Sequence, residues 1–521
     1  MKIKEAREAI IEDLKKAKLL LKQKPITHPV NTHERCGTEV EFVHSKQWFI
    51  KYLDLKDEMM KWGREFNWYP EHMKNRYDNW VNGLSWDWCI SRQISFGIPF
   101  PVWYCEDCDE TILAKVENLP VDPTEDKPPV DKCPNCESKN IVGETDIINT
   151  WATSSLTPTI VKELFKGKPV YNYLNKNPMD LRPQGHDIIS FWLFNTVVKS
   201  HLHYQMKPWN TCFINGWILD PQGKKMSKSK GNVIEPQKMI EKYSADALRY
   251  MASGTKLGED LPFPEKDIVT GQKFVNKLWN ASKFSIMHLE DFKLKADVEF
   301  QKLETFDRWL LSKLQKVIKE ATESFEAFEF SKSKAATELL FWHSFCDQYL
   351  EIVKDRLYNP EQRGSDKRES AQYTLYTTLL DILKLVAPFT PHITEEIYQL
   401  YFKDKESDES IHVSLWPKFN AKLIDENAEK TGDIGIDIIN AVRKFKSEQQ
   451  ISLREELEEL TLISPENFDQ EEFELMIDRI ADDLKAVLNT KKLNFSGTTD
   501  LVSEEFKVKL SVKLAENKAK Y

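Results

Sequence analysis

Residues 212–243 read CFINGWILDPQGKKMSKSKGNVIEPQKMIEKY, a run that passes from apolar to basic to amphipathic. The apolar start, Cys212 to Leu219, predicts a buried strand, and the DPQG that follows predicts a turn. A basic loop from Lys224 to Asn232 then holds four lysines, two serines and one glycine. Pro236 suits the first turn of a helix. A strand, a lysine-rich loop and a helix in this order predict a loop that closes over the phosphates of a nucleotide.

The chemistry of that loop depends on Lys225 and Lys228. Their ammonium groups can stabilise the negative charge that develops as phosphates separate. The small serines and Gly231 allow the loop to approach a ligand closely and to move. The alternative is a solvated basic loop, which is what most lysine runs are. The loop by itself leaves both interpretations open.

Composition and charge are those of an ordinary globular protein. The 521 residues, 41% hydrophobic and 30% charged, suffice for roughly three or four domains. The chain lacks the run of about 18 apolar residues that a membrane span needs, and its charged amphipathic start is not a signal peptide, so no membrane is expected and the cytoplasm is the expected location. A net charge of −10 argues against a protein coated in nucleic acid but allows a local basic groove.

Four of the eight cysteines form two close pairs, Cys105-x-x-Cys108 and Cys133-x-x-Cys136. In a large chain of this kind, paired cysteines predict metal ligands before disulfides. Four thiolates complete a tetrahedral zinc site and leave no position for water, so a structural Zn²⁺ is predicted. The alternative is four reduced thiols after metal loss or replacement. The other cysteines are isolated and are predicted to be packing residues: Cys36, Cys89, Cys212 and Cys346.

Residues 182–192, RPQGHDIISFW, form a second polar constellation. Gly185, His186 and Asp187 precede an apolar run from Ile188 to Val198 that predicts a helix. Glycine lets the backbone approach a ligand at a helix N-terminus, and Asp187 can accept hydrogen bonds from a ribose. The alternatives are an N-cap role for Asp187 and a satisfied structural histidine at His186. On these residues alone the alternatives rank first.

In combination, these motifs resemble the class I aminoacyl-tRNA synthetases. Lys225-Met226-Ser227-Lys228-Ser229 is similar to the lysine-rich signature loop of that family, and WDWCISRQ at 86–93 resembles a second signature, of members specific for branched aliphatic amino acids. Further segments stand in the order seen in the valine-specific members of archaeal and eukaryotic type, and the resemblance runs from residue 1 to about residue 420: Thr150-Trp151, Ser154-Ser155, Gly185-His186-Asp187-Ile188-Ile189, Phe191-Trp192 and Asn215-Gly216-Trp217. Because the motifs occur in this order, ligand binding becomes the preferred interpretation of Gly185-His186-Asp187, ahead of an N-cap and a structural histidine.

The resemblance implies a reaction and a set of roles. The reaction is activation of valine by ATP, with Mg²⁺ carried by ATP, to valyl-adenylate, and then transfer to the 3′ ribose of tRNA(Val). Lys225 and Lys228 would be catalytic, binding the triphosphate and the departing pyrophosphate. Trp151, Ile188 and Trp192 would wall an amino-acid pocket that excludes isoleucine by size but cannot strongly reject threonine. The implied ATP and adenylate site consists of two segments: Gln184, Gly185, His186 and Asp187, and Lys225, Met226, Ser227, Lys228 and Ser229.

The sequence departs from the family pattern in one small and one large way. Asn149 stands where members usually have an aspartate before Thr-Trp, which keeps the shape and one acceptor but loses the charge. The His-x-Gly-His type motif of the first half of the nucleotide-binding fold does not occur in the chain, and the proofreading domain is expected to precede residue 1. We therefore expect either one subunit of a split enzyme with a separate N-terminal chain or a truncated sequence, and no activity without that half.

The predicted fold is multidomain, α/β plus all-α. The expected parts are a helix leaving the absent editing domain (1–24), ended by Pro25; the rest of the connective insertion with a zinc ribbon (25–145); the C-terminal half of a Rossmann-like catalytic domain (146–269); a helical anticodon-binding domain (270–420); and a small α+β module (425–521). The bundle helices are expected at Lys273–Leu289, Phe306–Phe325, Lys332–Leu357, Glu369–Val386 and Pro391–Phe402.

The small module is predicted to hold a helix over Asp433–Gln450 and a strand over Phe506–Leu514. That strand is expected to pair antiparallel with Leu460–Ile463 and Leu493–Phe495. Its lysine face could contact tRNA phosphates, although a solvated face is at least as good an interpretation. The basic face of the helix carries Arg443, Lys444 and Lys446. Two competing functions stay open, an isoleucine-specific relative and a non-catalytic tRNA-binding fragment of a synthetase.

Overall fold

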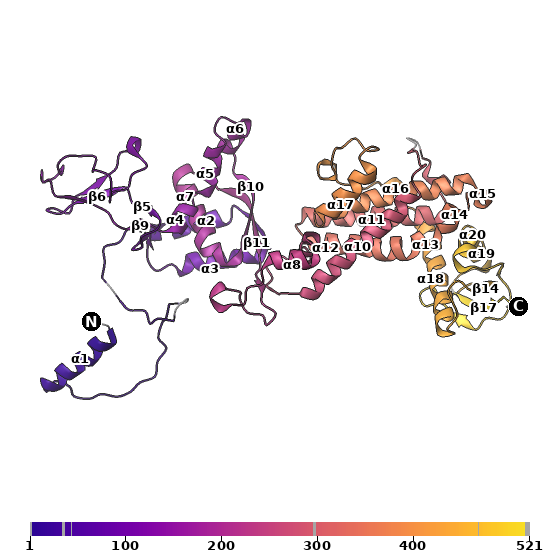
Figure 1. Ribbon diagram of the computed structural model, residues 1–521, viewed down its shortest axis with the longest axis horizontal. Coiled ribbons are helices and arrows are strands. Elements are labelled where there is room, and N and C mark those ends of the chain that lie inside the picture. The colour runs from indigo at the N-terminus through magenta and orange to yellow at the C-terminus, as the bar shows by residue number, and fades with distance from the viewer. Residues whose placement is uncertain (1–2, 34–36, 43, 295–297, 467, 516–521) are drawn as a thin grey trace. The chain divides into compact units, whose positions relative to one another are not determined.

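The computed structural model describes residues 3–33, 37–42, 44–294, 298–466 and 468–515 (Figure 1). The chain divides into two compact units. The first comprises residues 1–55, 84–153 and 228–231, and the second comprises residues 56–83, 154–227 and 232–521. Within the described ranges, no helix is both long and apolar enough to cross a membrane. Cys36, predicted to be a packing residue, lies outside the described residues.

The first unit begins with α1 (Ile3–Lys16), which buries none of its residues. The predicted helix over 1–24 is too long, because Lys18 takes the left-handed φ of 59°, which ends a helix well before Pro25. Short antiparallel strands follow. The strand β1 (Phe49–Ile50) pairs with β3 (Trp88–Cys89), and β9 (Ile147–Ile148) lies between β4 (Ser91–Arg92) and β5 (Ile98–Pro99).

A second small sheet of the first unit carries the cysteine pairs. Its central strand β6 (Val102–Cys105) pairs antiparallel with β7 (Thr111–Leu113) and with β8 (Ile141–Gly143). Trp103 of β6 is 2% exposed and anchors the sheet. The helix α4 (Thr150–Ser154) also belongs to this unit, except for its last residue, Ser154.

The second unit opens with a parallel three-stranded sheet in the order β10 (Met179–Gly185), β11 (Trp209–Asn215), β2 (Asn67–Tyr69). Strand β11 is the central strand, and its side chains Trp209, Cys212 and Ile214 are fully buried. Along the chain, these strands are preceded and followed by helices: α2 (Lys56–Gly63), α3 (Lys74–Gly83), α5 (Thr157–Leu164), α6 (Pro169–Lys176) and α7 (Phe194–Tyr204).

The strand predicted over Cys212–Leu219 is interrupted in the structure. It ends at Asn215 and resumes as β12 (Ile218–Leu219), which pairs in parallel with β13 (Leu261–Pro262). The break lies at Gly216, where an added Cβ would stand 1.9 Å from the carbonyl oxygen of Glu259. Only glycine fits this close approach of two backbones, so the chain leaves the sheet here.

The segment after β10 is helical but not uniformly α-helical. A 3₁₀ turn over His186–Ile188 passes into a π-helical stretch over Ile189–Leu193, and α7 begins only at Phe194. The predicted helix over Ile188–Val198 is therefore correct as helical structure and wrong as one regular helix. A π-helical stretch inside a helix often marks a functional site.

The remainder of the second unit is mostly helical. The predicted helices over Phe306–Phe325 and Glu369–Val386 are confirmed as α11 (Thr305–Glu326) and α16 (Ser365–Val386). The helix predicted over Lys273–Leu289 is present as α10 (Glu265–Met287), but it begins earlier, so the boundary predicted after residue 269 falls inside a helix. The helix predicted over Lys332–Leu357 is instead a succession of α12 (Phe330–Leu339), a π-helical stretch (Leu340–Tyr349), α13 (Leu350–Ile352) and α14 (Lys354–Tyr358). The remaining helices are α8 (Pro236–Tyr243), α9 (Ala245–Ala252), α15 (Pro360–Arg363) and α17 (Pro391–Ile397), which continues as a π-helical stretch over Tyr398–Phe402.

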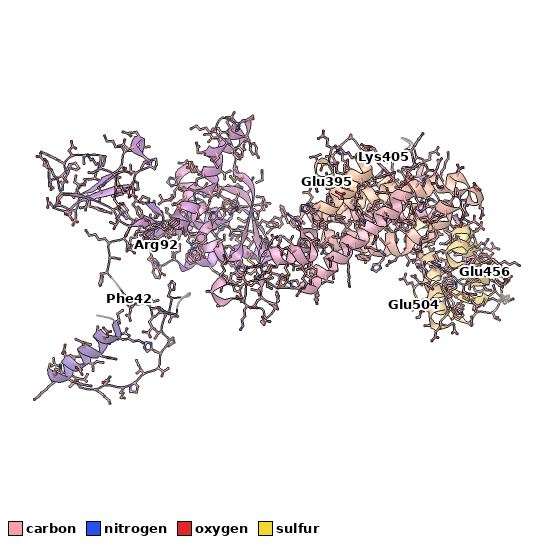
Figure 2. All side chains as sticks on the ribbon, in the orientation of Figure 1. Phe42, Arg92, Glu395, Lys405, Glu456 and Glu504 are labelled. Atoms are coloured by element: carbon pink, nitrogen blue, oxygen red, sulfur yellow. The ribbon has the colours of Figure 1, made fainter. Side chains whose placement is uncertain are left out.

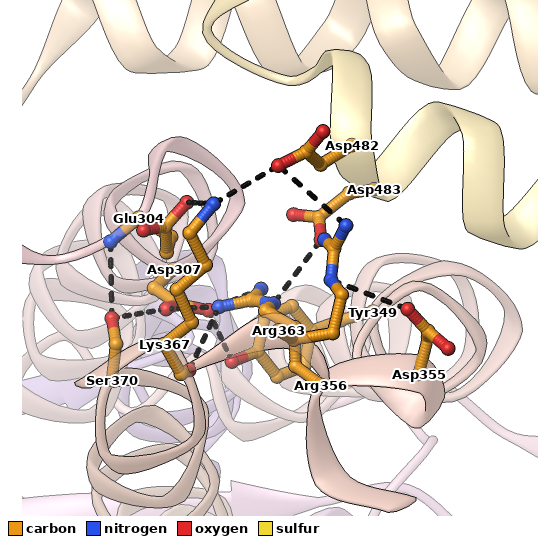
Figure 3. A network of polar contacts seen from close by, with 10 residues as sticks. All are labelled: Glu304, Asp307, Tyr349, Asp355, Arg356, Arg363, Lys367, Ser370, Asp482 and Asp483. Carbon is orange, nitrogen blue, oxygen red and sulfur yellow. Dashed lines mark hydrogen bonds and ion pairs between the residues drawn. The ribbon is translucent and has the colours of Figure 1, made fainter. Parts of the chain in front are cut away.

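The C-terminal module packs on this bundle through α18 (Glu426–Glu448) and one continuous apolar core. Its sheet has the order β15 (Leu493–Asn494), β14 (Leu457–Ile463), β17 (Lys509–Leu514), β16 (Leu501–Val502). The antiparallel pairing of β14 with β17 is confirmed, but β15 pairs in parallel with β14 and not with β17. The helices α19 (Gln470–Asp478) and α20 (Ala481–Leu488) complete the module, and a buried ionic network joins α20 to the bundle (Figure 3).

Candidate functional site

The lysine-rich loop is fastened at both ends by a pair of polar side chains. Asp220, 4% exposed, accepts hydrogen bonds from the backbone N–H groups of Gln222 (3.0 Å) and Lys224 (2.7 Å). Its second oxygen accepts from Nδ2 of Asn232 at 2.8 Å, and Oδ1 of Asn232 accepts from the backbone N–H of Ser227 at 2.9 Å. The Asn232 amide and these N–H groups lower the pKa of Asp220. The two residues hold the loop ends together, and Lys224 and Lys225 are exposed beside them.

Lys225 is half-exposed and points back toward the strand ends. Its Nζ lies 3.5 Å from Oδ2 of Asp187 and 3.9 Å from the centre of the Trp217 ring. An ammonium over an indole face is attracted by the ring quadrupole. Both contacts are long or soft and both partners are exposed enough for solvent to compete. Lys225 is therefore held near Asp187 without being neutralised in a tight pair.

A polar cluster of buried His186 and the more exposed Asp260 and Trp217 lies at the base of the loop. His186, 6% exposed, has Nε2 2.8 Å from Oδ1 of Asp260, and the same oxygen accepts from the backbone N–H of Trp217 at 2.8 Å. Partial burial opposes ionisation of Asp260, but the Trp217 and His186 hydrogen bonds outweigh it and lower its pKa. Since an ionised carboxylate only accepts, Nε2 of His186 carries a proton. Asp260 thus ties the segment after β10 to the start of β12.

Two acceptors at the end of β10 are buried without a hydrogen-bond partner among the described residues. They are Oε1 of Gln184 and Nδ1 of His186. Buried polar atoms of this kind are rare in folded proteins and call for an explanation. Asp187 beside them is exposed and does not cap the following turn through its side chain. The N-cap alternative for Asp187 is therefore wrong.

Trp192 is enclosed from two directions. Its ring stacks on Trp209 with centroids 5.3 Å apart and planes at 6°, and the Arg182 guanidinium lies 3.6 Å from the ring centre. Nε1 of Trp192 donates to the carbonyl of Ser154 at 3.0 Å. These contacts fix the indole firmly, and Ile188 lies at the end of the 3₁₀ turn before it. Their common pocket with Trp151 stays a prediction, because Trp151 belongs to the first unit.

Asn149 has a clear local task. Its Oδ1 accepts from the backbone N–H of Trp151 at 2.8 Å at the start of α4, and Asn149 is 6% exposed. Asparagine and aspartate are equally good residues for satisfying the free N–H groups of a helix start. The loss of charge at this position therefore leaves the cap intact.

The four paired cysteines converge in the first unit. Their Sγ atoms all lie within 4.8 Å of one another, with Cys105–Cys136 and Cys108–Cys133 at 3.5 Å. Zinc–sulfur bonds of about 2.3 Å in a tetrahedron separate sulfurs by about 3.8 Å, so the donor set fits zinc.

The two cysteine pairs sit in equivalent turns. In the first, the N–H of Asp109 donates to the carbonyl of Cys105 (2.9 Å). In the second, the N–H of Glu137 donates to the carbonyl of Cys133 (3.0 Å). Both residues take a left-handed φ, 58° and 59°. The turns are therefore two copies of one knuckle that aims both thiols of a pair to the same side.

Comparison with known proteins identifies the family. The sequence model described as tRNA synthetases class I (I, L, M and V) matches residues 5–264, and the anticodon-binding domain of tRNA ligase matches residues 307–461. The valine–tRNA ligase of Picrophilus torridus is 42% identical over 97% of this chain, and that of Rickettsia conorii is 38% identical over 96%. The chain belongs to the class I tRNA synthetases.

A solved structure agrees with this synthetase fold. Mycobacterium tuberculosis methionyl-tRNA synthetase in complex with methionyl-adenylate has a TM-score of 0.52 at 17% identity, covering 71% of this chain and 66% of that one. At this identity the likeness concerns the fold alone. The chain spans 62% of the Picrophilus relative and 61% of the Rickettsia relative.

The structure thus brings together one part of the site predicted for this synthetase. Gln184, Gly185, His186, Asp187 and Lys225 gather near the carboxyl ends of β10 and β11, where Gly185 is in register with Asn215. The side chain of Met226 contacts the segment that follows the loop, because its sulfur accepts a hydrogen bond from the backbone N–H of Ile234 at 3.4 Å. Lys228 and Ser229 belong to the first unit, in a 3₁₀ turn over Lys228–Lys230, so their place in the site stays a prediction.

Three further residues support the predicted site and are not assigned to it by any motif in the sequence. Asp220 and Asn232 fasten the loop, and Asp260 joins His186 to Trp217. The DPQG turn was a usable signal for Asp220, because aspartate at the start of a turn bonds to N–H groups that follow it. Asp260 lies far along the chain after two helices, and no local pattern announces its contact with His186.

Proposed function

We propose that this chain carries valine–tRNA ligase activity, forming valyl-adenylate from valine and ATP and transferring valine to tRNA(Val). The observation that carries the proposal is the 38–42% identity to valine–tRNA ligases over 96–97% of the chain. The geometry supports it, since the fastened lysine loop and the GHD segment meet at the carboxyl ends of parallel strands, where ligands bind in open α/β sheets.

The roles follow from the chemistry of each group. Gln184, Gly185, His186 and Asp187 would receive ATP and the adenylate, and the buried acceptors of Gln184 and His186 are suited to hydroxyl or amino donors of the ligand. Lys225 and Lys228 would stabilise charge on the phosphates as pyrophosphate departs. Mg²⁺, when bound with ATP, would neutralise phosphate charge. No enzyme nucleophile is required, because the valine carboxylate attacks the α-phosphate.

A further chain is part of this proposal. Strand β10 pairs with β11 on one side, and no strand among the described residues pairs with its other side. Leu181 of β10 is 40% exposed, and exposed apolar side chains also lie on α5 and α6, among them Leu164 and Tyr173. Parallel strands are normally covered and paired, so this edge suits an added strand from a separate N-terminal chain.

The proposed activity is tested by valine-dependent exchange of pyrophosphate into ATP. The reaction is measured with this chain alone and with the N-terminal segment of the Picrophilus relative supplied as a separate polypeptide. We expect exchange that requires valine and appears only with the added segment. Exchange by this chain alone would remove the second chain from the proposal and keep the activity.

Two other results would change the assignment. Exchange that responds to isoleucine in preference to valine would identify an isoleucine-specific enzyme. Binding of tRNA(Val) without exchange in either preparation would identify a non-catalytic tRNA-binding protein. The full-length Picrophilus relative, assayed in parallel, tests whether the added segment and the reagents are competent.

The cysteine cluster supplies a separate proposal, a structural zinc ion held by Cys105, Cys108, Cys133 and Cys136. The expected zinc content is about one ion per chain. Cys133→Ser should lose the zinc and lower the unfolding temperature of the first unit, because metal-binding energy is folding energy in small metal-built modules. Metal analysis and calorimetry measure both. The matched control is Cys89→Ser, outside the cluster, which should keep the metal; equal zinc in the two variants would contradict the assignment.

A further inference from the structure

Asp260 lies just before β13 and contacts two other segments of the second unit. Its Oδ1 lies 2.8 Å from Nε2 of His186 and accepts a hydrogen bond from the backbone N–H of Trp217 at 2.8 Å. The carbonyl oxygen of Trp217 accepts in turn from the N–H of Leu261 at 2.8 Å. Asp260 and Leu261 therefore hold the backbone of Trp217 on both sides, and the same carboxylate holds the imidazole of His186.

The hydrogen bond from Trp217 decides which ring nitrogen of His186 carries the proton. A backbone N–H can only donate, so Oδ1 of Asp260 is an acceptor. Partial burial opposes ionisation of Asp260, yet its two hydrogen bonds lower its pKa, so the group is a carboxylate. Nε2 of His186 faces the same oxygen and is therefore the donor. In a neutral imidazole with its proton on Nε2, the other nitrogen, Nδ1, is an acceptor.

This acceptor is buried and has no donor inside the protein. His186 is 6% exposed, and within the residues that the structure describes its Nδ1 has no hydrogen-bond partner. Oε1 of Gln184, two residues earlier on β10, is also buried without a partner in those residues. A buried acceptor without a donor is destabilising. A hydroxyl or amino group of a ligand would supply the donor.

The unused acceptor lies within the predicted nucleotide site. The ring of His186 contacts the indole of Trp217 with centroids 4.6 Å apart, and Nζ of Lys225 lies 3.9 Å from the centre of that indole. Lys225 also lies 3.5 Å from Oδ2 of Asp187, the neighbour of His186 in sequence. Through one imidazole and one indole, Asp260 therefore supports both the GHD segment and Lys225 of the loop.

Glu395 of the helical bundle, labelled in Figure 2, is a carboxylate whose role is structural. Its Oε2 also accepts two hydrogen bonds, from Oγ of Ser410 at 2.8 Å and from the N–H of Ile411 at 3.1 Å. Its Oε1 accepts from Nε2 of Gln399 at 2.7 Å, so both oxygens have donors inside the protein. The contacts of Asp260 differ, because they end in a buried acceptor that has none.

We propose that Asp260 is a positioning residue of the nucleotide site, holding His186 in the tautomer whose Nδ1 accepts a hydrogen bond from a hydroxyl or amino group of the nucleoside of ATP. The inference rests on the proposed function, in which ATP is a substrate. The oxygen of Asp260 is what acts, and its charge is not required. Because the N–H of Trp217 orients that oxygen, an asparagine with its oxygen in the same place would keep both hydrogen bonds.

The test measures ATP affinity by titration calorimetry, in this chain mixed with the N-terminal segment of the Picrophilus relative. His186→Gln can keep a donor near the position of Nε2, and His186→Asn can keep an acceptor near that of Nδ1. His186→Gln should weaken ATP binding by about 5- to 150-fold, because the nucleoside donor loses its partner. His186→Asn should keep more of the affinity but unfold at a lower temperature, because Asp260 loses a donor.

Variants of Asp260 test the positioning role directly. Asp260→Ala should weaken ATP binding by about 10²-fold, because the imidazole is then free to turn and to change tautomer. Asp260→Asn should restore most of the affinity. The matched control is Glu395→Ala, which should lower the unfolding temperature and leave ATP affinity unchanged. Circular dichroism checks that each variant is folded. Equal losses in Asp260→Asn and Asp260→Ala would assign the effect to charge and overturn the proposal.

Three ATP analogues identify the donor: 2′-deoxy-ATP, 3′-deoxy-ATP and purine riboside triphosphate, which lacks the amino group of adenine. Wild type and His186→Gln should bind equally to the analogue that lacks the donor, and the difference between them should persist with the other two. A difference that persists with all three analogues would overturn the proposal. No ATP binding by the wild type, or equal affinity of wild type and His186→Gln for ATP, would do the same.

The result is separable from that of the proposed function. The titrations contain neither valine nor tRNA and measure binding alone. An affinity for ATP that depends on His186, without valine-dependent exchange, would refute the activity and leave the roles of Asp260 and His186 standing. Valine-dependent exchange with one KM for ATP in wild type, His186→Gln and Asp260→Ala would support the activity and overturn these roles.

Discussion

Replacing Arg356 with alanine is expected to lower the free energy of unfolding of the second unit by about 3–5 kcal/mol. The guanidinium is 0% exposed, and its Nη1 and Nη2 donate to the two oxygens of Asp307 at 2.8 and 3.0 Å (Figure 3). Its Nε lies 3.3 Å from Oδ1 of Asp483 on α20. Alanine would leave the buried carboxylate of Asp307 without its cation, with only the bonds from Tyr349 and Ser370, and would leave Asp483 with Arg363 alone.

The measurement is urea unfolding followed by circular dichroism, with two comparisons. Lys302→Ala removes an exposed ion pair with Glu299, side chains 74% and 68% exposed, and should cost less than about 1 kcal/mol. The double variant Arg356→Met with Asp307→Leu should recover much of the loss, because apolar side chains of similar size can replace a buried ion pair. A single variant as stable as wild type would show that the network contributes nothing to folding.

The same network joins α20 to the helical bundle through further ion pairs. Arg363 donates from Nη2 to Asp483 at 2.9 Å, and Lys367 reaches Asp482 at 3.1 Å. The end of α20 lies beside the buried Lys446, whose Nζ donates to the carbonyl oxygen of Leu488 at 3.2 Å.

The helical region could be predicted because helix faces repeat. Leu310, Leu314 and Ile318 of α11 lie on one buried stripe, and a period of 3.6 residues is visible in any single sequence. The π-helical stretch over Leu340–Tyr349 was not predictable in this way. Periodicity reports which side chains are buried, whereas the change to π-helix depends on backbone hydrogen bonds set by the packing around it.

The basic face of α18 shows a second limit. Arg443, Lys444 and Lys446 look alike in sequence, yet one lines a cavity, one makes an exposed ion pair and one is a buried donor to three carbonyl oxygens. The difference comes from the loop after α18 and from α20, which are distant in sequence. In contrast, the cysteine pairs were predictable, because a knuckle is a local structure specified by the spacing of its thiols.

The same contrast applies to the lysine loop. Its location and charge are local features, so Lys225 and Lys228 could be chosen from the motif. Its shape depends on Asn232 reaching Asp220, and its base depends on Asp260 reaching His186, contacts that no periodicity encodes. The joint position of Lys225 and Lys228 on a phosphate stays a prediction that activity must test.

Lys228→Ala is expected to lower the rate of valine-dependent exchange by about 10²–10³-fold, the usual loss when one group that stabilises developing charge is removed. Lys228 is exposed at the start of its 3₁₀ turn, and among the described residues no carboxylate oxygen lies within 4.0 Å of its ammonium. Its charge is therefore available to a phosphate. The assay is steady-state exchange in the preparation that supports it, with ATP varied.

The pattern of kinetic constants distinguishes catalysis from simple attraction of ATP. A group that acts on the transition state lowers kcat and kcat/KM together, whereas general attraction changes KM. Lys230→Ala is the matched control, since it removes the same charge from the other end of the same turn and should change the rate little. Lys228→Arg should recover part of the rate by keeping the charge. Equal losses of rate in Lys228→Ala and Lys230→Ala would contradict a specific role for Lys228. They would indicate that the loop only attracts anions through its total charge, because a catalytic effect that depends on position should differ between two neighbouring lysines.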